Sequence, residues 1–205
     1  MVARREWSGG TPGAVQELGG RILPVHIDAT DGETTIGLDQ GAVTLDRPQV
    51  PVDDLLTALG LETLEADTIG DLMCGSVGSR HLLVALASMA AVDAVRPDGA
   101  RLRSLLGVAG AQGCYVYATE TDELSTSANA YARFFNPTVG IAEDPATGSA
   151  AGPLAAHLAA GRTGDVTILQ GVRMGRPSAL RVAVRDDGTT LNGTCALSAT
   201  GRLTS

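Results

Sequence analysis

An apolar stretch without a polar face is the strongest constraint on the fold of this chain. From Ala151 to Ala160 there is no carboxylate, lysine or arginine. A helix that is apolar all round is buried rather than laid on a surface. Pro153 falls within or just after the first turn, and Gly161 is well placed to end the helix. The side chains that cover all its sides are Ala150, Ala151, Leu154, Ala155, Ala156, Leu158, Ala159 and Ala160.

The residues in front of this helix form a candidate site. They read Glu143-Asp144-Pro145-Ala146-Thr147-Gly148-Ser149-Ala150. Asp144-Pro145 predicts an extended or turn conformation, Gly148 lets the backbone approach a ligand closely, and Ser149 is expected to be the helix N-cap. The N–H groups of such a helix start bind carboxylates and other anions. Asp144 adds a group that can transfer a proton, and Ser149 adds a hydroxyl. We therefore predict a site that binds a ligand and also acts on it chemically.

Composition narrows the classes of partner. The net charge is -8 and no Lys/Arg run occurs, so nucleic acid and anionic membrane surfaces are not expected partners. No segment approaches the roughly 18 apolar residues of a membrane helix, and residues 1–13 lack the apolar core of a signal peptide. Cys74, Cys114 and Cys195 are odd in number and show no metal spacing. We expect a cytoplasmic protein with reduced thiols and no metal.

Alternation of apolar and polar residues predicts strands in antiparallel meanders, an α+β pattern rather than a βαβ alternation. The first two strands, 21–29 and 34–38, form a hairpin around Asp31-Gly32. Further strands are expected at 40–45, in two runs within 68–86, and at 114–119, 128–135, 165–169, 179–185 and 190–198. Short helices are expected to start at Pro51, Ser88 and Pro97. Residues 1–20 are expected to be a frayed leader.

One family carries a similar signature. The stretch from Gly140 to Ala150 resembles that of the phenazine-biosynthesis PhzF-like isomerases. The resemblance implies a diaminopimelate-epimerase-like α+β fold, with antiparallel strands wrapped around a buried central helix in each of two similar domains. It also implies a small carboxylate-bearing substrate between them, no metal or organic cofactor, and often a homodimer. The supporting segments are 16–28, 81–86 with 92–98, and Ala132-Arg133-Phe134-Phe135 with Pro137.

The resemblance implies roles for the loop residues. Asp144 and Ser149 fall on its catalytic, substrate-contacting positions, and Gly148, Ala150 and Thr147 on the substrate-binding loop, where Thr147 shapes the backbone. Purely structural roles stay open for both residues, with Asp144 as a carboxylate in a turn and Ser149 as a helix cap. A serine at position 149, where thiol-dependent epimerases need a cysteine, argues against a two-thiol epimerase. We interpret His157 as a packed histidine and Cys74 as a buried structural thiol, and assign His26 and His81 no role.

Two segments of the family pattern do not occur here. One is a Ser-Glu-Thr tripeptide, whose Glu shuttles the proton, and the other is Gly-His-Ala/Pro-Thr. Glu33-Thr34-Thr35 resembles part of the Ser-Glu-Thr tripeptide, but Gly32 stands in place of the serine, and we interpret the segment as an exposed turn. We therefore predict an incomplete first domain at 1–50 and a second domain at 51–205, with the option that the last strand crosses back to the first.

Two functions follow from these predictions. The first is a PhzF-like isomerase or epimerase that works by cofactor-free proton transfer and needs its base from elsewhere. The second is an inactive remnant that binds small anions. Unpaired strand edges predict a homodimer or a partner that carries the absent half.

Overall fold

The computed structural model describes residues 14–18, 20–30, 33–61, 69–119 and 128–195. Its helices are α1 (Val52–Leu59), α2 (Met89–Ala94), α3 (Gly99–Ala109), α4 (Gly148–Ala159) and two 3-10 turns, η3 (Pro137–Val139) and η4 (Val172–Met174). Its strands are β1 (Ala14–Leu18), β2 (Arg21–Thr30), β3 (Glu33–Gly41), β4 (Thr44–Asp46), β5 (Ile69–Ser76), β6 (Arg80–Leu86), β7 (Gly113–Ala118), β8 (Ala130–Asn136), β9 (Ile141–Asp144), β10 (Gly164–Gln170), β11 (Ser178–Arg185) and β12 (Gly188–Cys195).

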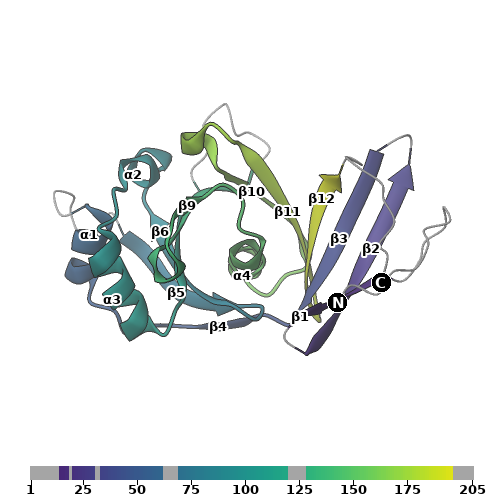
Figure 1. Cartoon of the computed structure of the whole chain (residues 1–205), viewed down its shortest axis with the longest axis horizontal. Coiled ribbons are helices and arrows are strands. Elements are labelled where there is room, and N and C mark those ends of the chain that lie inside the picture. The colour runs from purple at the N-terminus through teal and green to yellow at the C-terminus, as the bar shows by residue number, and fades with distance from the viewer. Residues whose placement is uncertain (1–13, 19, 31–32, 62–68, 120–127, 196–205) are drawn as a thin grey trace, which may run out of the picture.

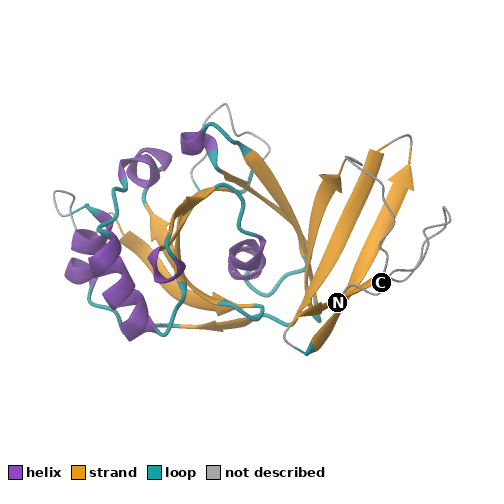
Figure 2. Ribbon diagram, in the orientation of Figure 1, coloured by secondary structure: helices purple, strands orange, loops and turns teal. Residues whose placement is uncertain are grey.

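The described strands form one 12-stranded sheet that curls around α4. Its order is β1-β2-β3-β12-β11-β10-β8-β7-β6-β5-β4, and off this path β9 pairs with the end of β8 at Phe134 and Asn136. Figure 1 shows α4 end-on inside the curl, with α1, α2 and α3 outside it and β1, β2, β3 and β12 extending as a wing. Figure 2 shows the strands in orange around one central helix in purple. The α+β class is confirmed.

Strands β6 to β8 are buried on both faces. Alternate side chains of a strand point to opposite faces, so Leu82 and Val84 pack with α1, α2 and α3, whereas Leu83 packs with α4. Two buried faces explain why 81–86 reads as a nearly continuous apolar run instead of an alternating one.

The prediction of a buried helix is confirmed for its first half. Ala150 to Ala155 are buried, whereas the residues from Ala156 to Ala159 are half-buried. Pro153 lies inside the helix and, lacking an N–H, cannot donate to the carbonyl of Ser149. The left-handed C-cap is Ala160, with φ 51°, one residue before the predicted stop at Gly161.

A buried glutamine ties the wing to α4. Gln40 of β3 donates through Nε2 to the carbonyl oxygen of Gly148 at 2.9 Å and accepts from Thr189 Oγ1 of β12 at 3.1 Å. Arg21 of β2 donates to the carbonyl oxygens of Val77, at 2.6 Å, and of Gln40, at 3.0 Å. These bonds satisfy polar groups at the junction, so the wing is held against the helix start by directional contacts as well as by the sheet ladder.

Several sequence predictions were wrong in detail. Residues 14–18 form strand β1, paired with β2, although the patternless leader predicted no structure there. Two pairings, β6 with β7 and β8 with β10, are parallel, so the sheet is not a pure meander. The strand expected at 40–45 is divided between the end of β3 and β4.

The predicted hairpin in the wing agrees with the structure. The hairpin of β2 and β3 is confirmed, with Thr30 paired to Glu33, and its tip at 31–32 lies outside the described residues. β12 pairs antiparallel with β3. The division into two domains stays a prediction. None of the helices in the described residues is long and apolar enough to cross a membrane.

Gly75→Ala tests the close packing of α4 on the sheet. A Cβ at position 75 would lie 2.5 Å from Cβ of Pro153, a rigid ring that cannot swing away. We expect the free energy of unfolding to fall by about 1–3 kcal/mol, as measured by urea denaturation. The control is Gly107→Ala on exposed α3, where a Cβ meets nothing within 4 Å and better helix propensity should stabilise by about 0.5–1 kcal/mol. A neutral Gly75→Ala would contradict the packing.

Candidate active site

The candidate loop connects β9 to α4. Asp144 is the last residue of β9, which pairs with β8, and α4 begins at Gly148 with Thr147 as its N-cap residue. The prediction that Ser149 caps the helix was therefore wrong, because Ser149 lies inside the first turn. The sequence predicted that Gly148 allows a ligand to approach the backbone. In the structure the group that lies close to Gly148 is the side chain of Leu191. A Cβ there would lie 2.5 Å from Cδ2 of Leu191, so the glycine lets β12 pass over the helix start.

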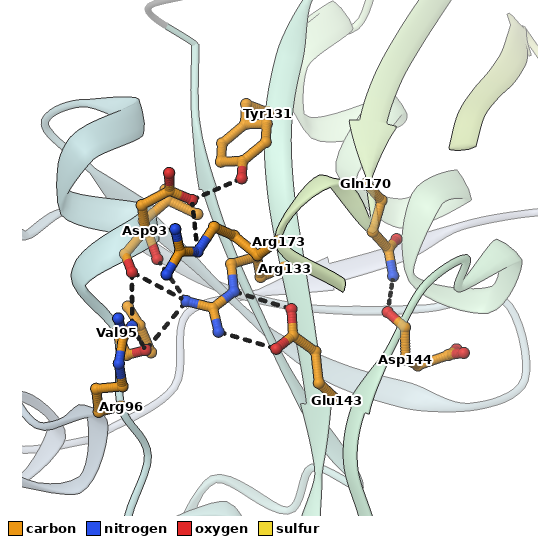
Figure 3. A network of polar contacts seen from close by, with 10 residues as sticks. Asp93, Val95, Arg96, Tyr131, Arg133, Glu143, Asp144, Gln170 and Arg173 are labelled. Carbon is orange, nitrogen blue, oxygen red and sulfur yellow. Dashed lines mark hydrogen bonds and ion pairs between the residues drawn. The ribbon is translucent and has the colours of Figure 1, made fainter. Parts of the chain in front are cut away.

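A fully buried glutamine fixes the shape of the loop. Gln170, at the end of β10, has 0% exposure. Its Oε1 accepts from the hydroxyl of Tyr115 at 2.7 Å and from the backbone N–H of Thr147 at 3.2 Å. Its Nε2 donates to the carbonyl oxygen of Asp144 at 2.6 Å (Figure 3) and to Thr147 Oγ1 at 3.0 Å. All four hydrogen-bonding positions of the amide are used, so the backbone on both sides of Pro145 is held in one conformation.

The Thr147 hydroxyl is turned away from the helix. Its oxygen accepts from Gln170, and its proton is donated to Asp144 Oδ2 at 2.6 Å. An N-cap threonine ordinarily accepts from the first N–H groups of its helix, but Thr147 makes no such bond. The N–H groups of Gly148 and Ser149 therefore have no acceptor among the described residues, whereas that of Ala150 donates to the carbonyl of Thr147 at 3.2 Å. The helix start is uncapped and half-exposed, with a carboxylate oriented beside it.

A histidine contacts Ser149 from the sheet. His81 of β6 is 2% exposed, and its Nε2 lies 3.0 Å from Ser149 Oγ. Burial lowers the pKa of His81 to about 4, so the imidazole is neutral near pH 7. Its Nδ1 has no hydrogen-bond partner among the described residues. A serine nucleophile needs a base near pKa 7 that a third group orients, so this pair is not arranged for acyl transfer.

A buried ion pair supports the strand that carries Asp144. Arg133 of β8 binds Glu143 through two hydrogen bonds of 2.9 Å and donates to the carbonyl oxygens of Val92 and Val95 at 3.0 Å (Figure 3). Burial opposes the charge of Arg133, but the bonds and charge of Glu143 outweigh it, and the pKa of the guanidinium is raised. The pair anchors β9 to the end of α2, so Glu143 serves the position of Asp144 rather than the ligand.

The other sequence candidates lie away from the loop. His157 approaches Asp71 at 3.4 Å near the far end of α4. Cys74 and Cys114 are buried, and burial raises the pKa of both thiols, which fits the structural role expected for Cys74. Glu33 opens β3, and its side chain is outside what the structure describes. No group of three or more His, Cys, Asp or Glu side chains suited to a metal occurs in the described ranges.

Known proteins with similar sequences decide the family. A family model described as phenazine biosynthesis-like protein matches residues 5–201. The chain belongs to this family. The trans-2,3-dihydro-3-hydroxyanthranilate isomerase of Pseudomonas aeruginosa is 35% identical over 173 residues, which cover 81% of this chain and 55% of that protein. Its namesake from Pseudomonas chlororaphis is 40% identical over 131 residues, 61% of this chain and 41% of that protein. This family member thus spans about half the length of those curated relatives.

Solved structures share the fold. A PhzF-family phenazine biosynthesis protein from Bacillus anthracis superposes with a TM-score of 0.75 at 22% identity, covering 89% of this chain and 64% of that one. A predicted epimerase from Pseudomonas aeruginosa gives 0.73 at 25% identity, covering 96% and 69%. The resemblance read from residues 140–150 is confirmed, and the sheet around α4 is the fold of PhzF-family proteins.

Three of the residues that build this site, His81, Tyr115 and Gln170, were not predicted from the sequence. His81 and Ser149 are 68 positions apart, and Tyr115 and Gln170 are 55 apart. Two of them carry a weak signal, since His81 precedes the apolar run of β6 and Gln170 follows Ile168-Leu169 at the end of β10. Such a polar residue predicts a buried polar contact but does not identify the partner.

Gln170→Leu should loosen the loop. The substitution leaves the Tyr115 hydroxyl and the Thr147 N–H without acceptors in a buried place, each at a cost of about 1–3 kcal/mol. We expect the free energy of unfolding to drop by about 3 kcal/mol, together with faster hydrogen exchange at the amide of Thr147. The matched control is Gln112→Leu, an exposed position where a change within about 0.5 kcal/mol is expected. Equal effects of the two variants would contradict the network.

The buried imidazole predicts a pH dependence of stability. The folded pKa of His81, about 4, lies below the ordinary value of 6.5, so only the unfolded chain takes up this proton as the pH falls from 6.5 toward 4. Its contribution is complete above the unfolded pKa and is lost on acidification. Between about pH 7 and about pH 4.5 the unaltered chain should lose about 2–3 kcal/mol more than His81→Gln, measured by urea denaturation. Parallel losses in both proteins would show that His81 titrates normally.

Proposed function

We propose that this chain holds the carboxylate of a small substrate in a PhzF-type isomerase that moves a proton between carbons without a cofactor. The observation that carries the proposal is the uncapped start of α4, with the Asp144 carboxylate fixed beside it by Thr147. A partner chain or a homodimer, which would complete the site, is part of the proposal.

The charges and donors of the loop support a carboxylate ligand. The free N–H groups of Gly148 and Ser149 lie at the positive end of the helix dipole, which attracts anions. The Ser149 hydroxyl is on the same turn. Each hydrogen bond to a charged group contributes about 1.5–3 kcal/mol, so two or three donors suffice for a small ligand. In this proposal Ala150 has a smaller part than Gly148 and Ser149, because its N–H donates to the carbonyl oxygen of Thr147.

Asp144 is the polar group placed to face the rest of the substrate. It accepts from Thr147 at one oxygen, Oδ2, and is half-buried. We propose that the other oxygen orients a hydroxyl or amino group of the substrate near the carbon that exchanges its proton. The relatives named trans-2,3-dihydro-3-hydroxyanthranilate isomerase suggest that compound as the first substrate to test.

A second function is favoured by one observation, which is that residues 1–205 contain no Ser-Glu-Thr segment. The resemblance assigns the proton shuttle to the Glu of that segment. Without a base the same loop would bind small anions and catalyse nothing. General acid–base catalysis contributes about 10²–10⁴-fold, and the difference between the two functions is therefore measurable.

Deuterium incorporation from D₂O into trans-2,3-dihydro-3-hydroxyanthranilate tests the proposal. We expect exchange by the chain alone at about 10⁻²–10⁻⁴ of the rate of the Pseudomonas aeruginosa isomerase, because the shuttle is absent. Asp144→Asn and Ser149→Ala should each lower this rate tenfold or more, by about 1.5–3 kcal/mol of lost hydrogen bonding. Mass spectrometry of the recovered compound provides the measurement.

Matched variants separate the site from general effects on the protein. Ser104→Ala on α3 and Asp187→Asn in the turn between β11 and β12 change the same groups at exposed positions and should leave the rate unaltered. Binding without any exchange would favour the anion-binding function. Exchange that is unaffected by Asp144→Asn and Ser149→Ala would contradict the site.

A further inference from the structure

His81 is a polar residue in a buried position, where an unpartnered ring nitrogen lowers the stability of the fold. The rest of β6 that faces the core is apolar, and the imidazole is 2% exposed with one nitrogen unpartnered among the described residues. A leucine would fill such a position without leaving a polar atom unsatisfied. Residues that break the packing rules of a core in this way are concentrated at functional sites.

The strands around His81 leave room for the ring but, among the described residues, no hydrogen-bond partner for its Nδ1. His81 pairs in register with Gly113 of the parallel strand β7. A Cβ on Gly113 would lie 2.4 Å from Cζ of Phe134 and 3.2 Å from Nδ1 of His81. The Phe134 ring packs edge-to-face against the imidazole, with centroids 5.0 Å apart. Nδ1 therefore faces a glycine and an aromatic ring, and the only polar side chain that the ring reaches in the described structure is Ser149.

The choice of tautomer follows from this asymmetry. A neutral imidazole has one N–H donor and one acceptor nitrogen. If the proton were on Nδ1, a buried N–H would have no acceptor, which is rarer in proteins than a buried acceptor without a donor. With the proton on Nε2, the N–H donates to Ser149 Oγ at 3.0 Å and only a lone pair stays unpaired.

We propose that His81 is a positioning residue, whose Nε2–H donates to Ser149 Oγ and thereby directs the Ser149 hydroxyl proton to the ligand. Ser149 then presents two donors, its O–H and its backbone N–H, and the site takes an acceptor such as a carboxylate oxygen. The identity of the ligand group rests on the proposed function, but the direction of the hydrogen bond does not.

The direction of the bond can be measured without any ligand. In protein labelled with ¹⁵N-histidine, a long-range ¹H–¹⁵N spectrum near neutral pH distinguishes the two tautomers. We expect the His81 signal, assigned by its loss in His81→Gln, to be that of the Nε2–H form. An Nδ1–H form would overturn the proposal, because the Ser149 proton would then be donated to His81.

The effect on the ligand is tested with benzoate as the probe. His81→Gln keeps an N–H donor near the position of Nε2, whereas His81→Leu keeps only bulk. We expect benzoate to bind His81→Gln within about threefold of the unaltered chain and His81→Leu about tenfold more weakly. Ser149→Ala should weaken binding similarly, and adding His81→Leu to it should cause no further loss. Thermal unfolding checks that every variant is folded.

The outcomes are separable. His81→Leu with unchanged benzoate affinity and lowered stability would make His81 a purely structural residue and overturn the proposal. If both His81→Leu and Ser149→Ala weaken binding but their effects add, the two residues act independently and the proposal also fails. If benzoate does not bind the unaltered chain, the proposed function fails, while the tautomer measurement still decides the direction of the bond.

Discussion

Burial of α4 inside the curled sheet is the constraint on which the rest of this structure depends. The helix has no polar face, so it is stable only where strands cover it, and the sheet from β5 round to β11 provides that cover. Close approach is possible because small residues meet at the contacts, as Gly75 does with Pro153. The N-terminus of the enclosed helix lies at the loop that follows β9.

The chemistry of the loop comes from how polar groups are satisfied behind it. Gln170 uses all its hydrogen-bonding positions to hold the loop, and Thr147 donates its proton to Asp144 instead of capping the helix. Because the Thr147 hydroxyl is used in this network, it does not accept from the first N–H groups of α4. A buried polar network that is complete is rigid, so the start of α4 is held in one conformation.

The chain belongs to the phenazine biosynthesis-like family, and several of its curated relatives are named as isomerases. The chain corresponds to about half of those relatives. Its described residues form a loop with an uncapped helix start, an aspartate held by Thr147 and a serine contacted by a buried histidine.

Local patterns in the sequence determined a large part of this protein. The apolar run after Ser149 predicted the buried helix, the signature from Gly140 to Ala150 predicted the family, and Ser88 and Pro97 predicted two helices that the structure contains. Those features depend on neighbours a few residues away. Tertiary structure decided the N-cap, the parallel strand pairs and the partners of Gln170, Arg133 and His81. The physical reason is distance along the chain: a buried polar side chain announces that it needs a partner, but only the folded sheet brings that partner, 10 to 68 residues away, within hydrogen-bonding range.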